Sequence, residues 1–364
     1  MTARGPSTQR GVVLLVVLFT TALLTLVVME FTFATQVDHR RAAHWLQAEQ
    51  ARLLARSGIE LGREILAQSP LVYSLLHGEA KVADSLAELW AGLCAPPGPN
   101  ACPNEFADLC VIDTGAGRLA LRITDESGLY NVNRLVRASH PAAERERSVF
   151  ERIAAAAGVE PEVLGALADW VDADDRPFPF GRGAESSVYA SRNPPYSPRN
   201  APFETFGELA LVAGLKPPDL VRLRRFVTVL DPSDTVTINV NTAPVELLAA
   251  LDPAIGPLAA ELVAQRCQRP FASVEDLRRR IPGWPHWLGE RWIHVRSAWF
   301  RIRATAMVGE VRQSAEALVH REGDGIRVVY YVTRRGVVIP QAEEAQAFGL
   351  DEVAARASSE SEMP

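Results

Sequence analysis

Five acidic residues crowd the stretch DWVDADDRPFPFGRGAE, which runs from Asp169 to Glu185. Asp169, Asp172, Asp174 and Asp175 fall within seven positions, beside apolar residues typical of a buried helix. Like charges three positions apart destabilise a helix, so this run needs either solvent or a bound cation. Hard cations such as calcium bind several carboxylate and carbonyl oxygens. Carboxylates of this segment and carbonyls of its Pro/Gly loop are therefore candidate calcium ligands.

The spacing of these acids is not that of an EF-hand. Asp172, Asp174, Asp175 and Glu185 are the candidate metal ligands from the residues alone. The competing interpretation is a solvated acidic helix end, since Pro177 follows closely. The local pattern leaves both interpretations open.

The rest of the chain offers little catalytic chemistry. It contains no phosphate-binding glycine loop, nucleophile elbow, HExxH or CxxC motif, and its seven histidines are scattered. We therefore expect no enzyme. Residues 238–277 resemble a helix-hairpin-helix module, a type that in some proteins binds DNA. Its hairpin reads DPAIGPL, where a second proline and an acid weaken phosphate binding. With a net charge of -6, no nucleic acid partner is expected, and a DNA-binding membrane protein is the alternative function.

The N-terminal region decides where these residues reside. No charged residue interrupts Val12–Met29, long enough for a membrane-spanning helix. Arg4 and Arg10 precede it, which places the N-terminus in the cytoplasm. A cleaved secretory signal is the alternative. Under either interpretation the body of the protein leaves the cytoplasm.

Outside the cytoplasm, cysteines can form disulfides. The candidate pair is Cys94 and Cys102, which closes a small Pro/Gly loop, with Cys102–Cys110 as the competing pairing. Sequence does not choose between them. Cys267 lies far away in a helical pattern, and we expect it to be a buried free thiol.

Hydrophobic periodicity predicts one helix from Val12 to Gln68, apolar all round over 12–29 and amphipathic over 30–68. The sequence Ser69-Pro70 is expected to end it. A β-hairpin near Gly115–Gly117 and a three-strand meander after residue 298, with turns at Gly309 and EGDG, are expected to join one sheet against this helix. The β domain then comprises 69–127 and 291–336, around a helical insertion at 128–290. Residues 341–364 are acidic and Ser-rich, and disorder is expected there.

The insertion contains a weak internal repeat. YNVNRL at 130–135 is echoed by INVNTAPVELL at 238–248, and PFETFGELALVAGL at 202–215 by PFASVEDLRRRIPG at 270–283. Each half has Asn-x-Asn, helices, Pro-Phe and an acid-started helix. Two similar helical units follow from this repeat.

Together, several segments resemble one family, the type II secretion system minor pseudopilin K, also called general secretion pathway protein K. The segments are RGVVLLVVLFTTALLTLVV, LLARSGIELG, DESGLYNVNRL, LADWVDADDRPFPFGRGAE, YASRNPPYSPRNAPFETFGEL and INVNTAPVELL, and they cover most of residues 10–336. The resemblance implies an α+β pilin-like fold with a large α-helical insertion. It implies a single-pass inner-membrane protein whose globular part lies in the periplasm. Its implied function is the tip of the type II secretion pseudopilus, in a complex with minor pseudopilins I and J.

The resemblance also implies processing by a prepilin peptidase. Cleavage after Gly11 makes Val12 the new, methylated N-terminus. Most pseudopilins have Glu at the fifth mature position, but this chain has Val16. Members of the K group typically lack this Glu, which fits a subunit at the end of a filament.

Calcium binding in the globular part is implied as well. By position, Asp172, Asp174, Asp175 and Glu185 are the implied ligands. Asp169 is expected to be structural, with Asn193 and Asn200 as further candidate ligands from the next loop. The sequence FGRGAE departs from the family pattern, because Gly-Arg adds Arg182, a cation, beside the expected site.

Overall fold

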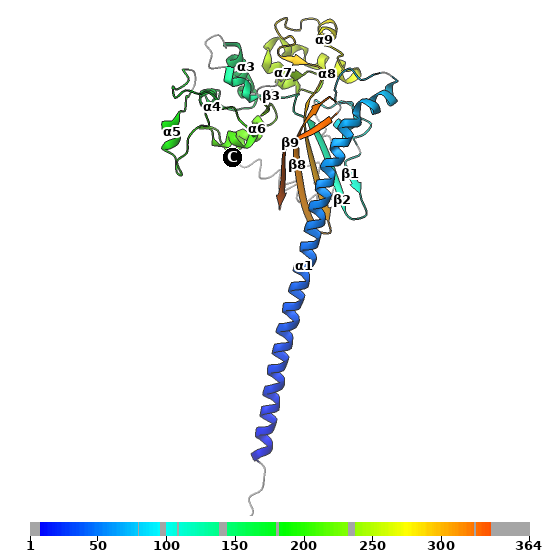
Figure 1. The fold of residues 1–364 in the computed structure, drawn as a ribbon, viewed down its shortest axis with the longest axis vertical. Helices are drawn as coiled ribbons and strands as arrows, with labels where there is room; N and C mark the ends of the chain where they lie inside the picture. Colours follow the sequence, from blue (N-terminus) through cyan, green and yellow to red (C-terminus); the bar gives the residue numbers. More distant parts are fainter. Residues whose placement is uncertain are drawn as a thin grey trace, which may run out of the picture.

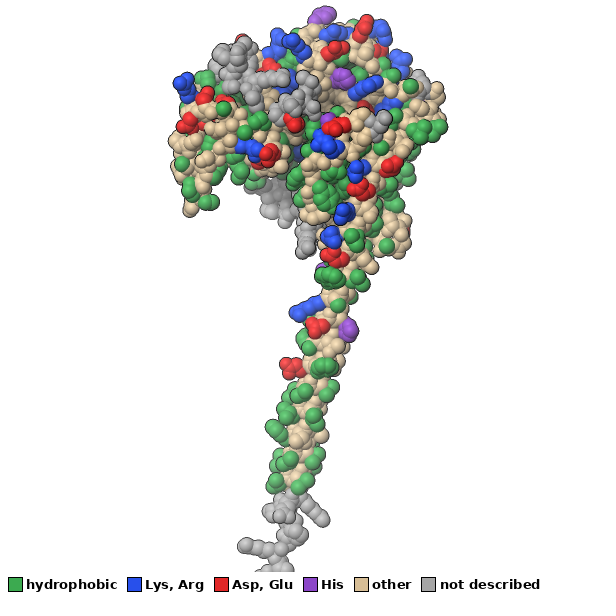
Figure 2. Space-filling view, viewed as in Figure 1, with side chains coloured by type: hydrophobic (Ala, Val, Ile, Leu, Met, Phe, Trp, Pro, Cys, Tyr) green, Lys and Arg blue, Asp and Glu red, His purple; other side chains and the backbone are tan. Residues whose placement is uncertain are grey.

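The structure is a computed structural model that describes residues 8–78, 80–94, 100–107, 109–137, 144–179, 182–231, 237–323 and 325–335. Helix α1, Thr8–His77, forms a stalk whose upper part packs into a globular head (Figure 1). Large apolar side chains cover the lower stalk and are solvent-exposed, as Figure 2 shows. Within the described residues, α1 is the single helix long and apolar enough to cross a membrane. The tail at 341–364 lies outside the described residues.

The predicted end of the long helix was wrong. Helix α1 continues through Pro70 to His77, and its last turns tilt away from the stalk axis (Figure 1). Proline costs a helix one backbone hydrogen bond and causes a kink, but local contacts can retain the helix beyond it. Here the Ser74 hydroxyl donates to the Pro70 carbonyl at 2.9 Å. The Ser69 hydroxyl also donates to Glu88, which fastens this turn to the head.

The sheet is antiparallel, with strand order β1-β2-β7-β8-β9. Strand β2 of the hairpin pairs with β7 of the meander, so segments far apart in sequence join one sheet, as predicted. The turns fall at Gly309 and Gly323, both with positive φ. The strands are β1 (Val111–Asp113), β2 (Arg118–Asp125), β7 (Trp299–Val308), β8 (Val311–Glu322) and β9 (Gly325–Arg335).

Alternating side chains of the sheet pack against α1. Two glycines of α1 allow the helix to approach closely. A Cβ at Gly58 would lie 2.7 Å from the Ala304 Cβ, and a Cβ at Gly62 would lie 2.6 Å from the Ile302 Cγ2. Helix α2 (Leu89–Gly92) adds buried Trp90 to the same core. The α+β pilin-like architecture predicted from the sequence is confirmed, with α1 lying across one face of the sheet.

Between β2 and β7 lies a second, mainly helical part with its own hydrophobic core. In Figure 1 it occupies the left side of the head, with α3 to α6, and its top, with α7 to α9. Its longer helices are α3 (Glu144–Ala156), α4 (Val163–Val171), α6 (Pro217–Leu223), α7 (Val245–Leu251), α8 (Ala259–Gln268) and α9 (Val274–Arg280). Its shorter helices are η1 (Val132–Arg137), α5 (Ser186–Ala190), η2 (Phe206–Leu211) and η3 (Pro253–Leu258).

Two small parallel sheets lie within this helical part. Strand β3 (Tyr130–Asn131) pairs with β4 (Val227–Thr228), and β5 (Ile238–Asn239) pairs with β6 (Ile293–His294). The first strand of each pair ends at the first Asn of one Asn-x-Asn copy. The second Asn of each copy contacts the Phe of the matching Pro-Phe: Asn133 contacts Phe203, and Asn241 contacts Phe271. The sequence repeat is therefore also a repeat of contacts.

Both predicted cysteine pairings were wrong. The disulfides join Cys94 to Cys110 and Cys102 to Cys267, and none of the four cysteines is free. Spacing favours short loops, but the fold brings α8 beside the segment that contains Cys102. Cys267 is consequently a disulfide partner across 165 residues of sequence rather than a buried thiol.

Candidate metal centre

Helix α4 positions the acidic residues. All nine of its residues are buried, and the helix ends where Asp172 adopts an extended backbone. Asp169 therefore points into the protein, while Asp172 and the residues after it enter a loop. The Asp169 carboxylate accepts hydrogen bonds from the Phe178 N–H at 2.8 Å and the Ala184 N–H at 2.5 Å. Asp169 thus closes the loop between α4 and α5, the structural role expected for it.

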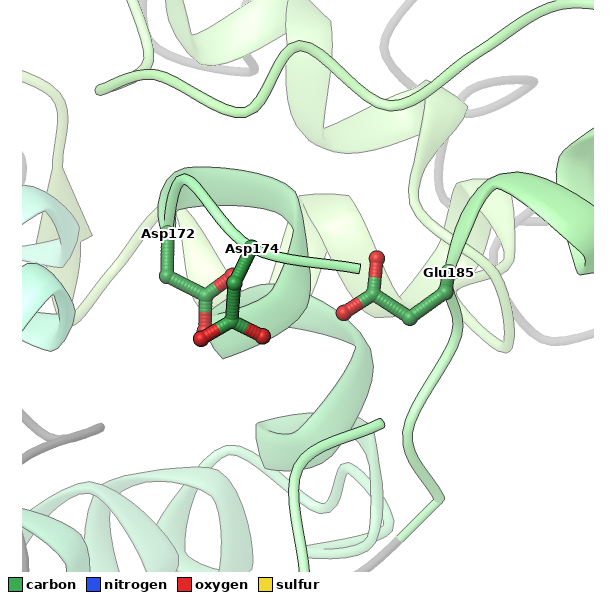
Figure 3. A group of neighbouring side chains, drawn as sticks. All are labelled: Asp172, Asp174 and Glu185. Carbon is green, nitrogen blue, oxygen red and sulfur yellow. The ribbon is translucent and has the colours of Figure 1, made fainter. Parts of the chain in front are cut away.

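Asp172, Asp174 and Glu185 form the candidate metal centre. One carboxylate oxygen from each lies within 4.8 Å of the other two. Figure 3 shows Glu185 reaching from the start of α5 toward the two aspartates that follow α4. Asp174 lies at the exposed side, Asp172 is half-buried, and Glu185 is only 3% exposed. The arrangement converges from two separate segments, which a solvated helix end would not require.

Several oxygens at this centre are buried without a protein hydrogen-bond donor. These are the Oδ1 atoms of Asp172 and Asn200 and both Oε atoms of Glu185. Buried acceptors without a donor are costly, and a cation satisfies them. All of these atoms are hard oxygen donors, the ligand type of calcium and magnesium. The residues therefore fit a hard divalent cation.

The electrostatics of the centre agree with this fit. Burial, together with the nearby Asp169, Asp172, Asp175 and Asp174, raises the pKa of Glu185 to about 7. Burial, with Asp169 and Asp174, raises the pKa of Asp172 to about 6. These carboxyl groups carry uncompensated repulsion, which a bound cation would relieve.

The other residues proposed from sequence lie around the centre. Asp175 does not belong to the three-carboxylate group, and its Oδ1 accepts from the Ser186 N–H at 3.3 Å. Asn200 donates from Nδ2 to the Asp174 carbonyl at 3.5 Å, which holds its unsatisfied Oδ1 near the site. Asn193 is exposed and precedes a cis proline.

The added cation does not neutralise the site. The Arg182 side chain is exposed and forms no ion pair with a described residue, while its N–H donates to the Glu162 carbonyl at 2.9 Å. Sequence reasoning missed Gly165 in α4, where a Cβ would lie 2.7 Å from the Arg182 carbonyl carbon. A glycine inside an otherwise apolar helix was the available signal for this close contact.

The predicted processing site lies at the base of the stalk. Gly11 and Val12 both belong to α1, and the Val12 side chain is exposed. The helix-hairpin-helix-like module comprises α7, η3 and α8. Its hairpin Asp252 accepts from the Ala254 N–H at 2.8 Å and from Trp287 Nε1 at 2.6 Å. The Asp252 carboxylate therefore already binds the Ala254 N–H, a backbone donor of the hairpin.

The stalk, the sheet and the helical part define a pilin-like protein with an inserted helical head. A similar fold occurs in the crystal structure of the GspK–GspI–GspJ complex from the enterotoxigenic Escherichia coli type 2 secretion system. The TM-score is 0.58 at 19% identity, over 81% of this chain and all of that chain.

Sequence comparison identifies the family. Residues 128–232 and 238–285 both match the family described as type II secretion system (T2SS), protein K. The type II secretion system protein K of Pseudomonas aeruginosa is 32% identical over 329 residues, 88% of this chain and 92% of that protein. The Klebsiella pneumoniae protein K is 29% identical over 88% of this chain and 95% of its own length. The chain belongs to the type II secretion system protein K family, and is a component of a secretion system rather than an enzyme.

Proposed function

We propose that this chain is a minor pseudopilin at the tip of the periplasmic type II secretion pseudopilus, where it aids export of folded proteins across the outer membrane. Helix α1 serves as a single-pass inner-membrane anchor, with the head in the periplasm. The observation that carries the proposal is the combination of an exposed apolar stalk with a bulky helical part. That part lies beside and beyond the sheet at the end remote from the lower stalk (Figure 1). A further subunit stacked above would meet this bulk.

The partners proposed are the minor pseudopilins I and J. The support is the similar E. coli protein, which was solved in complex with GspI and GspJ. The exposed apolar residues of α1 offer a surface for packing against similar helices once the stalk leaves the membrane.

Processing by a prepilin peptidase after Gly11 is proposed as well, which makes Val12 the methylated terminus. Val16 then takes the fifth mature position, where it offers no carboxylate to the terminal amine of a neighbour. The absence of this carboxylate at position 16 suits a subunit at a filament end.

Calcium is the cation proposed for Asp172, Asp174 and Glu185, with the Asn200 Oδ1 as a further donor. Bound there, calcium would supply positive charge and cross-link the end of α4 to the start of α5. The chain's own residues prepare this site: Asp169 holds the intervening loop, and Asn200 is held by the Asp174 carbonyl. The proposed role is structural stiffening of the helical part.

Co-production with the I and J pseudopilins and the peptidase tests this proposal. A ternary complex that co-purifies with this chain, and Val12 as the first residue by N-terminal sequencing, are the expected results. An intact Met1, or a failure to retain both partners, would contradict it. Specific DNA binding by the head at physiological salt would favour the alternative of a DNA-binding membrane protein.

A further inference from the structure

The segment that contains Asn100 and Cys102 connects to the helical part through several polar contacts. The Asn100 Oδ1 accepts from the Val245 N–H at 2.8 Å and thereby caps α7. Its Nδ2 donates to Glu246 Oε2 at 2.8 Å. Arg266, buried in α8, donates to the Asn100 carbonyl at 3.4 Å. One backbone N–H and two side chains of the helical part therefore hold this one segment.

The same segment connects to the sheet-bearing part at its other end. The Asn104 Nδ2 donates to the carbonyls of Leu86 and Glu88, each at 2.9 Å. Cys110, just before β1, is joined to Cys94 by a disulfide. The described residues of 100–110 thus contact both parts, whose hydrophobic cores are distinct, in addition to direct polar contacts between those parts such as Thr242 with Asp125 and Arg224 with Glu126. We call the described residues of this range, 100–107 and 109–110, the strap.

We propose that the Cys102–Cys267 disulfide is a redox latch: an oxidative modification site, served by a thiol–disulfide oxidoreductase, that locks the helical part onto the sheet-bearing part. The latch spans 165 residues of sequence, whereas Cys94–Cys110 spans 16. Closing a long loop removes more conformational freedom from the open chain. The latch therefore links the strap covalently to α8. The other disulfide, Cys94–Cys110, fastens the strap to the sheet-bearing part.

The position of the latch favours formation after docking. Cys267 follows Arg266, whose Nη1 donates to the carbonyls of Val240 and Ala243 at 3.2 and 2.6 Å. These contacts fix α8, and the Asn100 contacts fix the strap, so the two sulfurs meet only when both cores are folded. Cys102, Cys267 and Cys110 are half-buried, whereas Cys94 is 3% exposed. Both sulfurs of the latch are thus partly accessible to an oxidoreductase, whereas the other bond has one such sulfur, Cys110.

The bond forms by thiol–disulfide exchange. The two thiols lose two protons and two electrons as the sulfur–sulfur bond forms, and the disulfide of the oxidoreductase accepts them to become two thiols. This step rests on the proposed location of the head outside the cytoplasm, where disulfides persist. A cytoplasmic head would keep both cysteines reduced.

The test uses the full chain extracted from membranes in mild detergent. Maleimide-polyethylene glycol, added after denaturation without reductant, should produce no mass shift. Graded reduction of the folded protein should then expose Cys102 and Cys267 to labelling before Cys94 and Cys110. Free thiols at Cys102 and Cys267 in protein that begins at Val12 would overturn the latch while leaving the proposed function intact. Earlier release of Cys94 and Cys110 would also overturn it.

Hydrogen exchange at the Val245 amide gives a second readout, because its acceptor is Asn100 on the strap. The double variant Cys102→Ser/Cys267→Ser should lose protection at this amide, and the wild-type protein after graded reduction should behave alike. The matched control, Cys94→Ser/Cys110→Ser, should retain it, because that bond lies on the sheet side. Unchanged Val245 protection after selective opening of Cys102–Cys267 would show that the bond locks nothing.

Discussion

Asn241 and Phe271 exchange two hydrogen bonds, from Asn241 Nδ2 to the Phe271 carbonyl at 3.0 Å and from the Phe271 N–H to Asn241 Oδ1 at 2.8 Å. Asn133 and Phe203 make the same pair of bonds, at 2.9 and 2.8 Å. Each asparagine thus replaces a strand as the partner of a buried backbone position. This relationship explains why Asn-x-Asn and Pro-Phe recur together in the sequence.

Replacing Asn241 with Ala should therefore destabilise the helical part. Both Phe271 backbone groups would remain buried without a partner, a cost of about 2 to 4 kcal/mol in unfolding free energy. Chemical denaturation of a soluble head gives the measurement. Gln268→Ala, at an exposed position that ends α8, is the control and should change little. A loss no greater than that of the control would mean that water replaces the asparagine.

Removing calcium should lower the melting temperature of the head. A ligand present at a hundredfold excess over its dissociation constant stabilises by about 2.7 kcal/mol. Asp172→Asn or Glu185→Ala should abolish the response to calcium and to chelator. Asp175→Asn is the matched control, because its carboxylate lies outside the group of three. If chelation leaves the melting of the wild-type head unchanged, these acids bind no structural cation.

The acidic cluster and the disulfides differ in how far sequence could define them. Asp172, Asp174 and Glu185 lie close in sequence, so the local pattern and the resemblance together single them out. Cys102 and Cys267 meet only because α8 packs beside the strap, and no local pattern encodes that approach. Asp175 also illustrates the limit, since the direction of a loop carboxylate depends on a backbone path that spacing does not define.

The Glu126 carboxylate makes the free energy of unfolding depend on pH in the acid range. Burial would raise its pKa, but Arg301 and Arg224 outweigh burial and lower the pKa to about 2 from 4.5. The Arg301 Nε donates to it at 2.6 Å. Because the folded pKa is depressed, this contribution is present above about pH 4.5 and is lost as pH falls toward 2. The shift corresponds to about 3 kcal/mol. The expected result is a fall in unfolding free energy across that window.

The control for this acid dependence is the neighbouring Asp125. Burial raises its pKa from 3.8 to about 7, against bonds from the Ser297 and Thr242 hydroxyls. A raised carboxyl pKa has the opposite sign, so its cost grows as pH rises from about 4 to 7. In a plot of unfolding free energy against pH, Glu126→Gln should flatten the slope between about pH 2 and 4.5, and Asp125→Asn should flatten the slope between about pH 4 and 7. Equal pH profiles for the two variants would contradict these assignments.

Gly62→Ala should weaken the packing of α1 on the sheet. The new methyl group would meet the Ile302 Cγ2 at 2.6 Å, and such overpacking costs about 1 to 3 kcal/mol. The better helix propensity of alanine offsets up to about 1 kcal/mol of this. Ser57→Ala, on an exposed position of the same helix, makes no such contact and is the control. In an Ile302→Ala background the cost of Gly62→Ala should shrink, because the opposing atoms are gone. A Gly62→Ala head as stable as wild type in thermal unfolding would mean that helix and sheet separate to accept the methyl group without cost, and that the close approach of α1 is not needed for the pilin-like core.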